Sequence, residues 1–175
     1  MKINTKLTSE FKGIIQLLPE ESEKLIEIQD KILKIFPDQK RILKKGSPSF
    51  HITLLHQSIP KSVGQGKLRG DKLLKSFFKT GNQMELDNQS MQLELGDTFI
   101  SSQEGRISTF IKIVSRETCM QIRDKVLIGA GLDLKPCTLG DKESTRVFHI
   151  SLTNLTGNSG DSITFPQDSD KRILA

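Results

Sequence analysis

A short internal repeat restricts the architecture of this chain more than any other feature. Residues 28–33, Ile-Gln-Asp-Lys-Ile-Leu, match residues 122–127, Ile-Arg-Asp-Lys-Val-Leu, at an offset of 94 positions. Each copy has the apolar spacing of a helix, follows an apolar strand pattern, and is followed by a strand that begins with Phe-His. The recurring order of strand, helix and strand predicts one structural unit used twice.

Hydrophobic patterning on both sides of the repeat indicates an α+β fold. Alternating or continuous apolar runs predict strands at 12–18, 50–57, 91–100, 106–114 and 147–154. Helical spacing and helix-start residues predict helices from Pro19 to about Phe36, from Asp71 onward, and from Ser115 to about Gly129.

The duplicated order predicts one bilobal domain over residues 1–155. We expect two antiparallel sheets, flanked by helices and related by a pseudo-twofold axis, around a central cleft. Lobe 1 spans about 12–90 and lobe 2 about 91–155, with strands able to cross between them. Residues 156–175 are polar and contain Gly and Pro, so they are interpreted as a C-terminal tail, draped over the surface or partly disordered.

Composition narrows the class of protein. A chain of 175 residues with 35% apolar residues can bury a core without a metal or disulfide staple. Two cysteines exclude a secreted disulfide framework, and no group of residues has metal-ligand spacing, so no metal or cofactor is expected. Without a signal-peptide run or a membrane-length apolar run, we expect a cytoplasmic protein that does not associate with membranes. The net charge of +5 favours an anionic partner, and no obligate protein partner is evident.

Two of the three histidines lie in one recurring motif, histidine–apolar–hydroxyl–apolar. The copies are His51-Ile-Thr53-Leu and His149-Ile-Ser151-Leu, on equivalent strands of the repeat. Side chains two apart on a strand point to the same face, so each histidine is expected to project together with its hydroxyl. If the two halves are related by a twofold axis, all four polar groups meet in one cleft.

The four groups suit acid–base chemistry on a phosphate. Two imidazoles, with ordinary pKa values near 6.5, can serve as a base and an acid at neutral pH. Two hydroxyls can donate hydrogen bonds to phosphate oxygens. The motifs therefore predict His51 and His149 as catalytic residues and Thr53 and Ser151 as substrate-binding residues. They do not decide which histidine is the base.

With these paired motifs on the strands of a duplicated unit, residues 12–155 resemble the 2H phosphoesterase superfamily. The resemblance implies a bilobal α+β fold and metal-independent cleavage of RNA-like phosphodiesters. Members open 2′,3′-cyclic phosphates, hydrolyse 2′-5′ linkages, trim RNA ends or, in phage anti-defence proteins, degrade cyclic oligonucleotide signals. The implied partner is a nucleotide or oligonucleotide substrate.

Three further residues lie close to the motifs in the sequence. Arg146 is a candidate cation at the rim of the cleft, in contact with substrate. Phe148 is a candidate surface for stacking of a base, with core packing as the competing interpretation. His56 lies five positions after His51, so continued strand alternation would turn it away from the cleft.

Two functions of different classes remain open. The first is a phosphodiesterase that uses two-histidine acid–base catalysis. The second is a non-catalytic RNA- or nucleotide-binding module with the same cleft, although a pure binder has no need of two acid–base groups. Substrate specificity is expected to depend on the loops 37–49, 58–70 and 131–146.

Overall fold

The computed structural model describes residues 1–6, 13–44, 47–48, 50–56, 64–65, 68–84, 90–134, 146–167 and 170–174. In these ranges the chain forms three α-helices: α1 (Pro19–Ile35), α3 (Asp71–Gln83) and α4 (Arg116–Gly129). A single turn of 3₁₀-helix, η2, spans Ser159–Asp161. The expected α+β class is confirmed, and each helix begins within one residue of its expected start.

Eight strands of the described chain form one antiparallel sheet. They are β1 (Lys2–Lys6), β2 (Ile14–Leu17), β3 (Lys40–Arg41), β6 (His51–Thr53), β9 (Ser90–Gln103), β10 (Arg106–Ile113), β11 (His149–Asn154) and β12 (Lys171–Leu174). Two short ribbons lie apart from it: β4 (Leu43–Lys44) with β5 (Ser47–Pro48), and β7 (Gly64–Gln65) with β8 (Leu68–Arg69).

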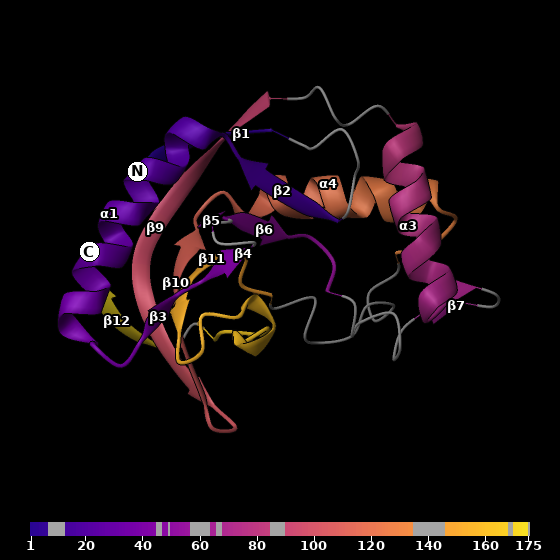
Figure 1. Cartoon of the computed structure of the whole chain (residues 1–175). Coiled ribbons are helices and arrows are strands. Elements are labelled where there is room, and N and C mark those ends of the chain that lie inside the picture. Colours follow the sequence, from indigo (N-terminus) through magenta and orange to yellow (C-terminus); the bar gives the residue numbers. More distant parts are fainter. Residues whose placement is uncertain are drawn as a thin grey trace.

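The strand order joins the two halves of the chain instead of separating them into two sheets. The order is β1-β2-β6-β11-β10-β9-β12, and β3 pairs with the far part of β11. Because β1 pairs with β9 as well as with β2, six strands close into a circuit. Strands β6 and β11, one from each half, are neighbours near the centre of the fold (Figure 1).

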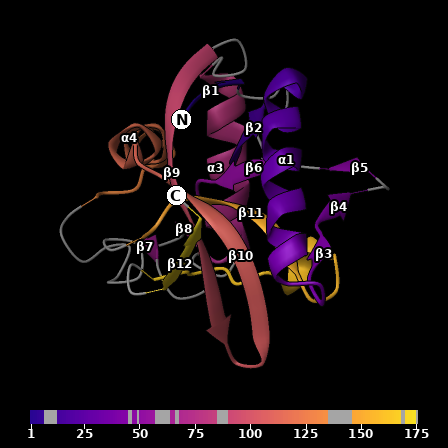
Figure 2. The same cartoon turned by 90° about the vertical axis from the view of Figure 1, so that its left-hand side faces the viewer.

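The helices lie on different sides of the sheet. In Figure 2, α1 and α4 flank the long strand β9 on opposite sides. Both helices bury apolar residues in the core, among them Leu25 and Ile32 of α1 and Val126 and Leu127 of α4. The buried side chain of Gln29 on α1 donates a hydrogen bond of 2.7 Å from Nε2 to the carbonyl of Leu152 on β11. The two copies of the sequence repeat, residues 28–33 and 122–127, lie within α1 and α4. The pseudo-twofold duplication of the whole unit stays a prediction.

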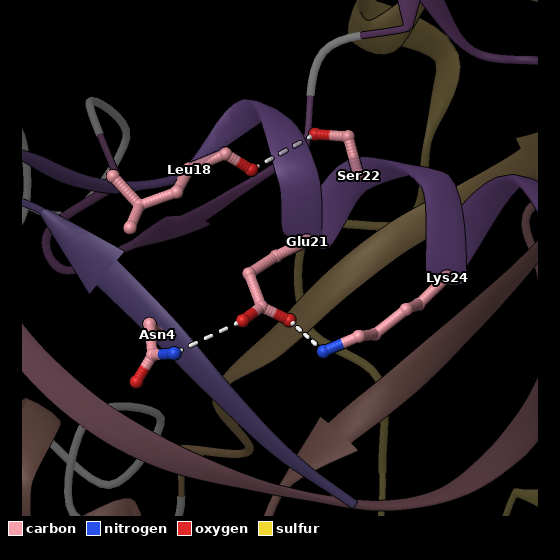
Figure 3. Close-up of polar contacts among 5 residues, drawn as sticks. All are labelled: Asn4, Leu18, Glu21, Ser22 and Lys24. Carbon is pink, nitrogen blue, oxygen red and sulfur yellow. Dashed lines mark hydrogen bonds and ion pairs between the residues drawn. The ribbon is translucent and has the colours of Figure 1, made fainter.

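The start of α1 is fixed by charge as well as by proline (Figure 3). Pro19 occupies the first turn, where its missing N–H costs little. The carboxylate of Glu21 is buried and accepts hydrogen bonds from Asn4 Nδ2 on β1, at 3.1 Å, and from Lys24 Nζ, at 2.6 Å. The bond from Lys24 holds the pKa of Glu21 below its usual value. These contacts connect α1 to β1, a strand that patterning did not predict.

The expected C-terminal tail is instead part of the fold. Strand β12 pairs with β9, Ile173 and Leu174 pack against the core, and Arg172 Nε lies 3.0 Å from Asp97 Oδ2. The composition of this segment is polar, but the strand uses backbone hydrogen bonds that composition does not reveal. The boundary expected at residue 155 is therefore wrong for the described residues 156–167 and 170–174.

Some residues and loops named from the sequence lie wholly or partly outside the described residues. Cys119 lies on the buried face of α4, where burial raises the pKa of its thiol to about 12, whereas Cys137 lies outside the described residues. The loops 37–49, 58–70 and 131–146 are described only in part. Among the described residues, no helix combines the length and apolarity needed to cross a membrane.

Candidate active site

The floor of the candidate site is the pair of central strands β6 and β11. They run antiparallel, with Ile52 directly opposite Ile150. Both isoleucines are fully buried, while the flanking His51, Thr53, His149 and Ser151 are all partly exposed. Alternation on each strand therefore places the apolar residues toward the core and the four polar side chains on the opposite face.

The register of this pair sets which polar groups are neighbours. With Ile52 opposite Ile150, His51 lies across from Ser151, and Thr53 lies across from His149. The two histidines are then diagonal neighbours, a relation that separates backbone positions on an antiparallel pair by about 7–8 Å. Each imidazole thus has a hydroxyl from the other motif beside it and a second imidazole on the diagonal.

All four side chains line one pocket of about 180 Å³. The remaining wall comes from segments before and after the motif strands. The part of the chain that the structure describes contributes three imidazoles, one guanidinium and several hydroxyls to this pocket; the lining residues are His51, Thr53, His56, Arg146, His149, Ser151, Ser159, Ser162 and Thr164, together with Ile42, Gly160 and Ile163.

His149 has a defined tautomer. Its Nδ1 lies 3.1 Å from the carbonyl oxygen of Val147, and because a carbonyl only accepts, Nδ1 carries the proton. In the neutral ring the lone pair is therefore on Nε2. Burial is the main reason that the pKa of His149 is lowered to about 4. The hydrogen bond to Val147, the second-largest effect, raises this pKa, and the charges of Arg146, His51 and His56 lower it. Near neutral pH, His149 is thus a neutral imidazole able to accept a proton at Nε2.

This lowered pKa makes stability depend on pH. Between pH about 6.5 and about 4, the unfolded state binds a proton at His149 that the folded state does not bind, so folding stability falls as pH falls through this window. We expect the free energy of unfolding, measured in urea at pH 7.5 and pH 5, to decline more in the wild type than in His149→Gln. Equal declines in the two proteins would contradict the assignment.

His56 lies in the pocket, and the expectation that it points away is wrong. Strand β6 ends at Thr53, and Leu54 and Leu55 are both buried although they are consecutive. The alternation that would have turned His56 away therefore stops three residues before it. Its ring lines the pocket and packs edge-on against Phe165, with 5.9 Å between centroids. Burial, and then the charge of Arg146, lowers the pKa of His56.

Arg146 lies inside the protein and not at the rim of a cleft. The residue is only 4% exposed, and it still lines the pocket. Its guanidinium donates to the carbonyls of Thr53, at 2.9 Å, and Leu54, at 3.3 Å, and lies 5.3 Å from the ring of Phe148. These hydrogen bonds connect the segment before β11 to the end of β6.

Phe148 is a core residue, which corrects its interpretation as a substrate contact. It is 1% exposed and is not among the residues that line the pocket. The reason is that side chains alternate between the two faces of a strand, so the consecutive residues Phe148 and His149 point in opposite directions. Phe110, on β10, is also buried and lies beside the site, with its ring edge-on to His149 at 5.5 Å.

Another wall of the pocket is a turn built on Asn154, which sequence reasoning missed. The buried Asn154 side chain donates to the Asn158 carbonyl, at 2.6 Å, and to Ser162 Oγ, at 3.0 Å. Its Oδ1 accepts from the backbone N–H groups of Thr156, at 3.1 Å, and Gly157, at 2.6 Å. Gly157 has a φ of +81°, which favours glycine. The run Asn-Leu-Thr-Gly-Asn-Ser-Gly-Asp, which begins at the last residue of β11, is the turn signal that could have revealed this wall.

The pocket carries positive potential. Among the described residues its lining includes no Asp or Glu, and the charge of Arg146 lowers the pKa of both His149 and His56. Within the described ranges, no group of three or more His, Cys, Asp or Glu is arranged to hold a metal ion. The arrangement of Arg146, the imidazoles and the hydroxyls can bind an anion, and His149 can accept a proton at Nε2.

No protein-family model, curated protein or solved structure shows a significant match to this chain.

Proposed function

We propose that this protein is a metal-independent phosphodiesterase that hydrolyses RNA-like phosphodiester bonds. The substrate class comprises 2′,3′-cyclic phosphates, 2′-5′ or 3′-5′ oligonucleotides and cyclic oligonucleotides. One observation carries the proposal: two histidine–hydroxyl pairs lie on adjacent antiparallel strands, on one face, in a pocket whose described lining residues include no carboxylate. A diagonal pair of imidazoles provides two proton-transfer groups on either side of a bound phosphate.

The proton roles follow from the state of His149. As the neutral imidazole with its lone pair on Nε2, His149 is the base and takes a proton from water or from a ribose 2′-hydroxyl. The resulting oxygen nucleophile attacks phosphorus, and the bond from phosphorus to the leaving oxygen breaks. His51, in its protonated form, is the acid that donates a proton to that leaving oxygen.

The hydroxyls stabilise the charge that develops on the phosphate. Thr53 and Ser151 flank the two imidazoles on the same face and donate hydrogen bonds to the non-bridging oxygens. The positive field from Arg146 has the same effect over a longer distance. A pocket of about 180 Å³ is below the roughly 300–1,000 Å³ of sites that enclose a whole small ligand, so only phosphate groups of the substrate and the sugar atoms next to them enter it.

The direct test is turnover in the presence of a chelator. Purified protein in EDTA is incubated with a panel of 2′,3′-cyclic mononucleotides, 2′-5′ and 3′-5′ dinucleotides and cyclic dinucleotides, and products are identified by mass spectrometry. We expect hydrolysis of at least one class at an undiminished rate in EDTA. Loss of turnover that a divalent ion restores would show that the chemistry depends on a metal. Saturable binding of nucleotides without turnover would indicate the binding-module alternative.

Removal of a single hydroxyl should lower the rate less than removal of an imidazole. Thr53→Val and Ser151→Ala each delete one donor to a charged oxygen, an interaction that contributes about 1.5–3 kcal/mol, so kcat is expected to fall about 10- to 150-fold. Thr53→Ser keeps the donor and should retain most of the activity. A Thr53→Val enzyme with the wild-type kcat would remove this residue from the proposed mechanism.

A further inference from the structure

We propose that His56 and Arg146 form a second anion subsite in the same pocket, and that the substrate carries a second phosphate next to the scissile one. This inference rests on the proposed function and narrows its substrate class. A nucleotide chain, linear or cyclic, then fits the pocket better than a cyclic mononucleotide, which has one phosphate only.

The geometry gives the pocket a charged end and a neutral end. Arg146 precedes β11 and is anchored to Thr53 and Leu54, whereas the turn with Ser159 and Ser162 is anchored to Asn154 at the other end of that strand. The neutral end offers hydroxyls and the charged end offers a guanidinium, so a second anion is stabilised at the charged end.

His56 belongs to the charged end. Phe165 lies 5.9 Å from the ring of His56 and 5.9 Å from the guanidinium carbon of Arg146, so one aromatic side chain contacts both groups. Their electrostatic coupling agrees with this proximity, because the charge of Arg146 lowers the pKa of His56. An imidazole held beside a guanidinium can donate a hydrogen bond to an anion that the guanidinium attracts.

The scissile phosphate does not account for His56. The two repeated motifs already supply the two imidazoles and two hydroxyls that the hydrolysis uses. His56 has no histidine equivalent in the second motif, because the residue five positions after His149 is Asn154, which holds the turn with Ser162. The two halves of the site therefore differ at this position, and the difference distinguishes one side of the substrate from the other.

The test compares two substrates that differ only in charge. Both are dinucleotides that end in a 2′,3′-cyclic phosphate; one has a natural internucleotide phosphate and the other a neutral methylphosphonate. We expect the wild type to prefer the charged dinucleotide by about tenfold or more in kcat/KM. In His56→Ala this preference is expected to fall to near 1, and His56→Asn, which keeps an N–H donor, should restore part of it. Lys125→Ala, which removes an exposed cation on α4, should keep the wild-type preference.

Failure of the subsite and failure of the hydrolysis give different results. If the wild type cleaves both dinucleotides equally well, or if His56→Ala lowers both rates by the same factor, the subsite is overturned and the hydrolysis stands. If neither dinucleotide is cleaved, the hydrolysis is overturned for this class, and binding decides the subsite. Imidazole C–H signals of His56 are followed by NMR during titration with inorganic pyrophosphate and inorganic phosphate. Saturable shifts with about tenfold tighter binding of pyrophosphate support the subsite, and unchanged His56 signals overturn it.

Discussion

Replacement of either motif histidine by alanine is expected to lower kcat/KM by about 10²- to 10⁴-fold, which is the contribution typical of one general acid or base. His149→Ala removes the neutral Nε2 acceptor that the bond to Val147 orients, and His51→Ala removes the proton donor. Because acid and base act in one step, the double variant should lose little more than each single variant. Steady-state rates on the substrate identified by the panel measure both effects, and Lys125→Ala serves as the folded control.

Two readouts separate a catalytic loss from a structural one. Exogenous imidazole should restore part of the rate to His149→Ala, because the vacated space can admit a small base. The acidic limb of kcat/KM in the wild type should lie near pH 4, well below the value of about 6.5 for an unperturbed imidazole, and it should disappear in His149→Ala. A wild-type limb near pH 6.5, or a folded His149→Ala enzyme with the wild-type rate, would refute the assignment of the base.

Asn154→Ala is expected to destabilise the fold by on the order of 4 kcal/mol, because four hydrogen bonds of roughly 1 kcal/mol each depend on one buried side chain. The same change detaches the turn that carries Ser159 and Ser162 from β11, so kcat/KM at a temperature where the variant is folded should also fall. Urea denaturation measures the first effect, and steady-state rates measure the second.

Asn158→Ala provides the matched control within the same turn. Its exposed side chain accepts one bond, from the N–H of Gly160 at 3.1 Å, and the backbone carbonyl that Asn154 contacts remains in place. A loss of no more than about 1 kcal/mol is expected. Equal urea midpoints for the two variants would mean that Asn154 does not organise the wall.

Local patterns in the sequence determined the helices and the faces of the strands. The proline at residue 19, the spacing of apolar residues and the acidic first turn define α1 closely, because these signals act within one or two turns of helix. Alternation also placed His51 with Thr53, and His149 with Ser151, on the solvent side of the buried Ile52 and Ile150. The alternation of side-chain direction along a strand is a property of the backbone and needs no tertiary contact.

Tertiary contacts decided where the strand pattern stops. Alternation alone predicts that the first motif strand continues to residue 57 and that His56 therefore points away from the site. In the structure Leu54 and Leu55 are both drawn into the core, and Arg146, more than 90 positions later in the chain, binds the carbonyls of Thr53 and Leu54. Burial of two consecutive leucines against distant segments outweighs the local preference for alternation, so no short window of sequence shows that His56 enters the pocket.

The sequence by itself therefore determined which side chains share a face, and only the tertiary structure decided which strands are neighbours. The pairing of Ile52 with Ile150 joins residues 98 positions apart and sets His51 beside Ser151 and Thr53 beside His149. Strand β12 and the turn on Asn154 likewise depend on hydrogen bonds of backbone and side-chain groups to other parts of the chain. The polar composition of residues 156–175 does not indicate these bonds. The physical reason is that the direction of a side chain depends on local dihedral angles, whereas strand adjacency depends on the burial of apolar surface and the pairing of backbone groups across the whole chain.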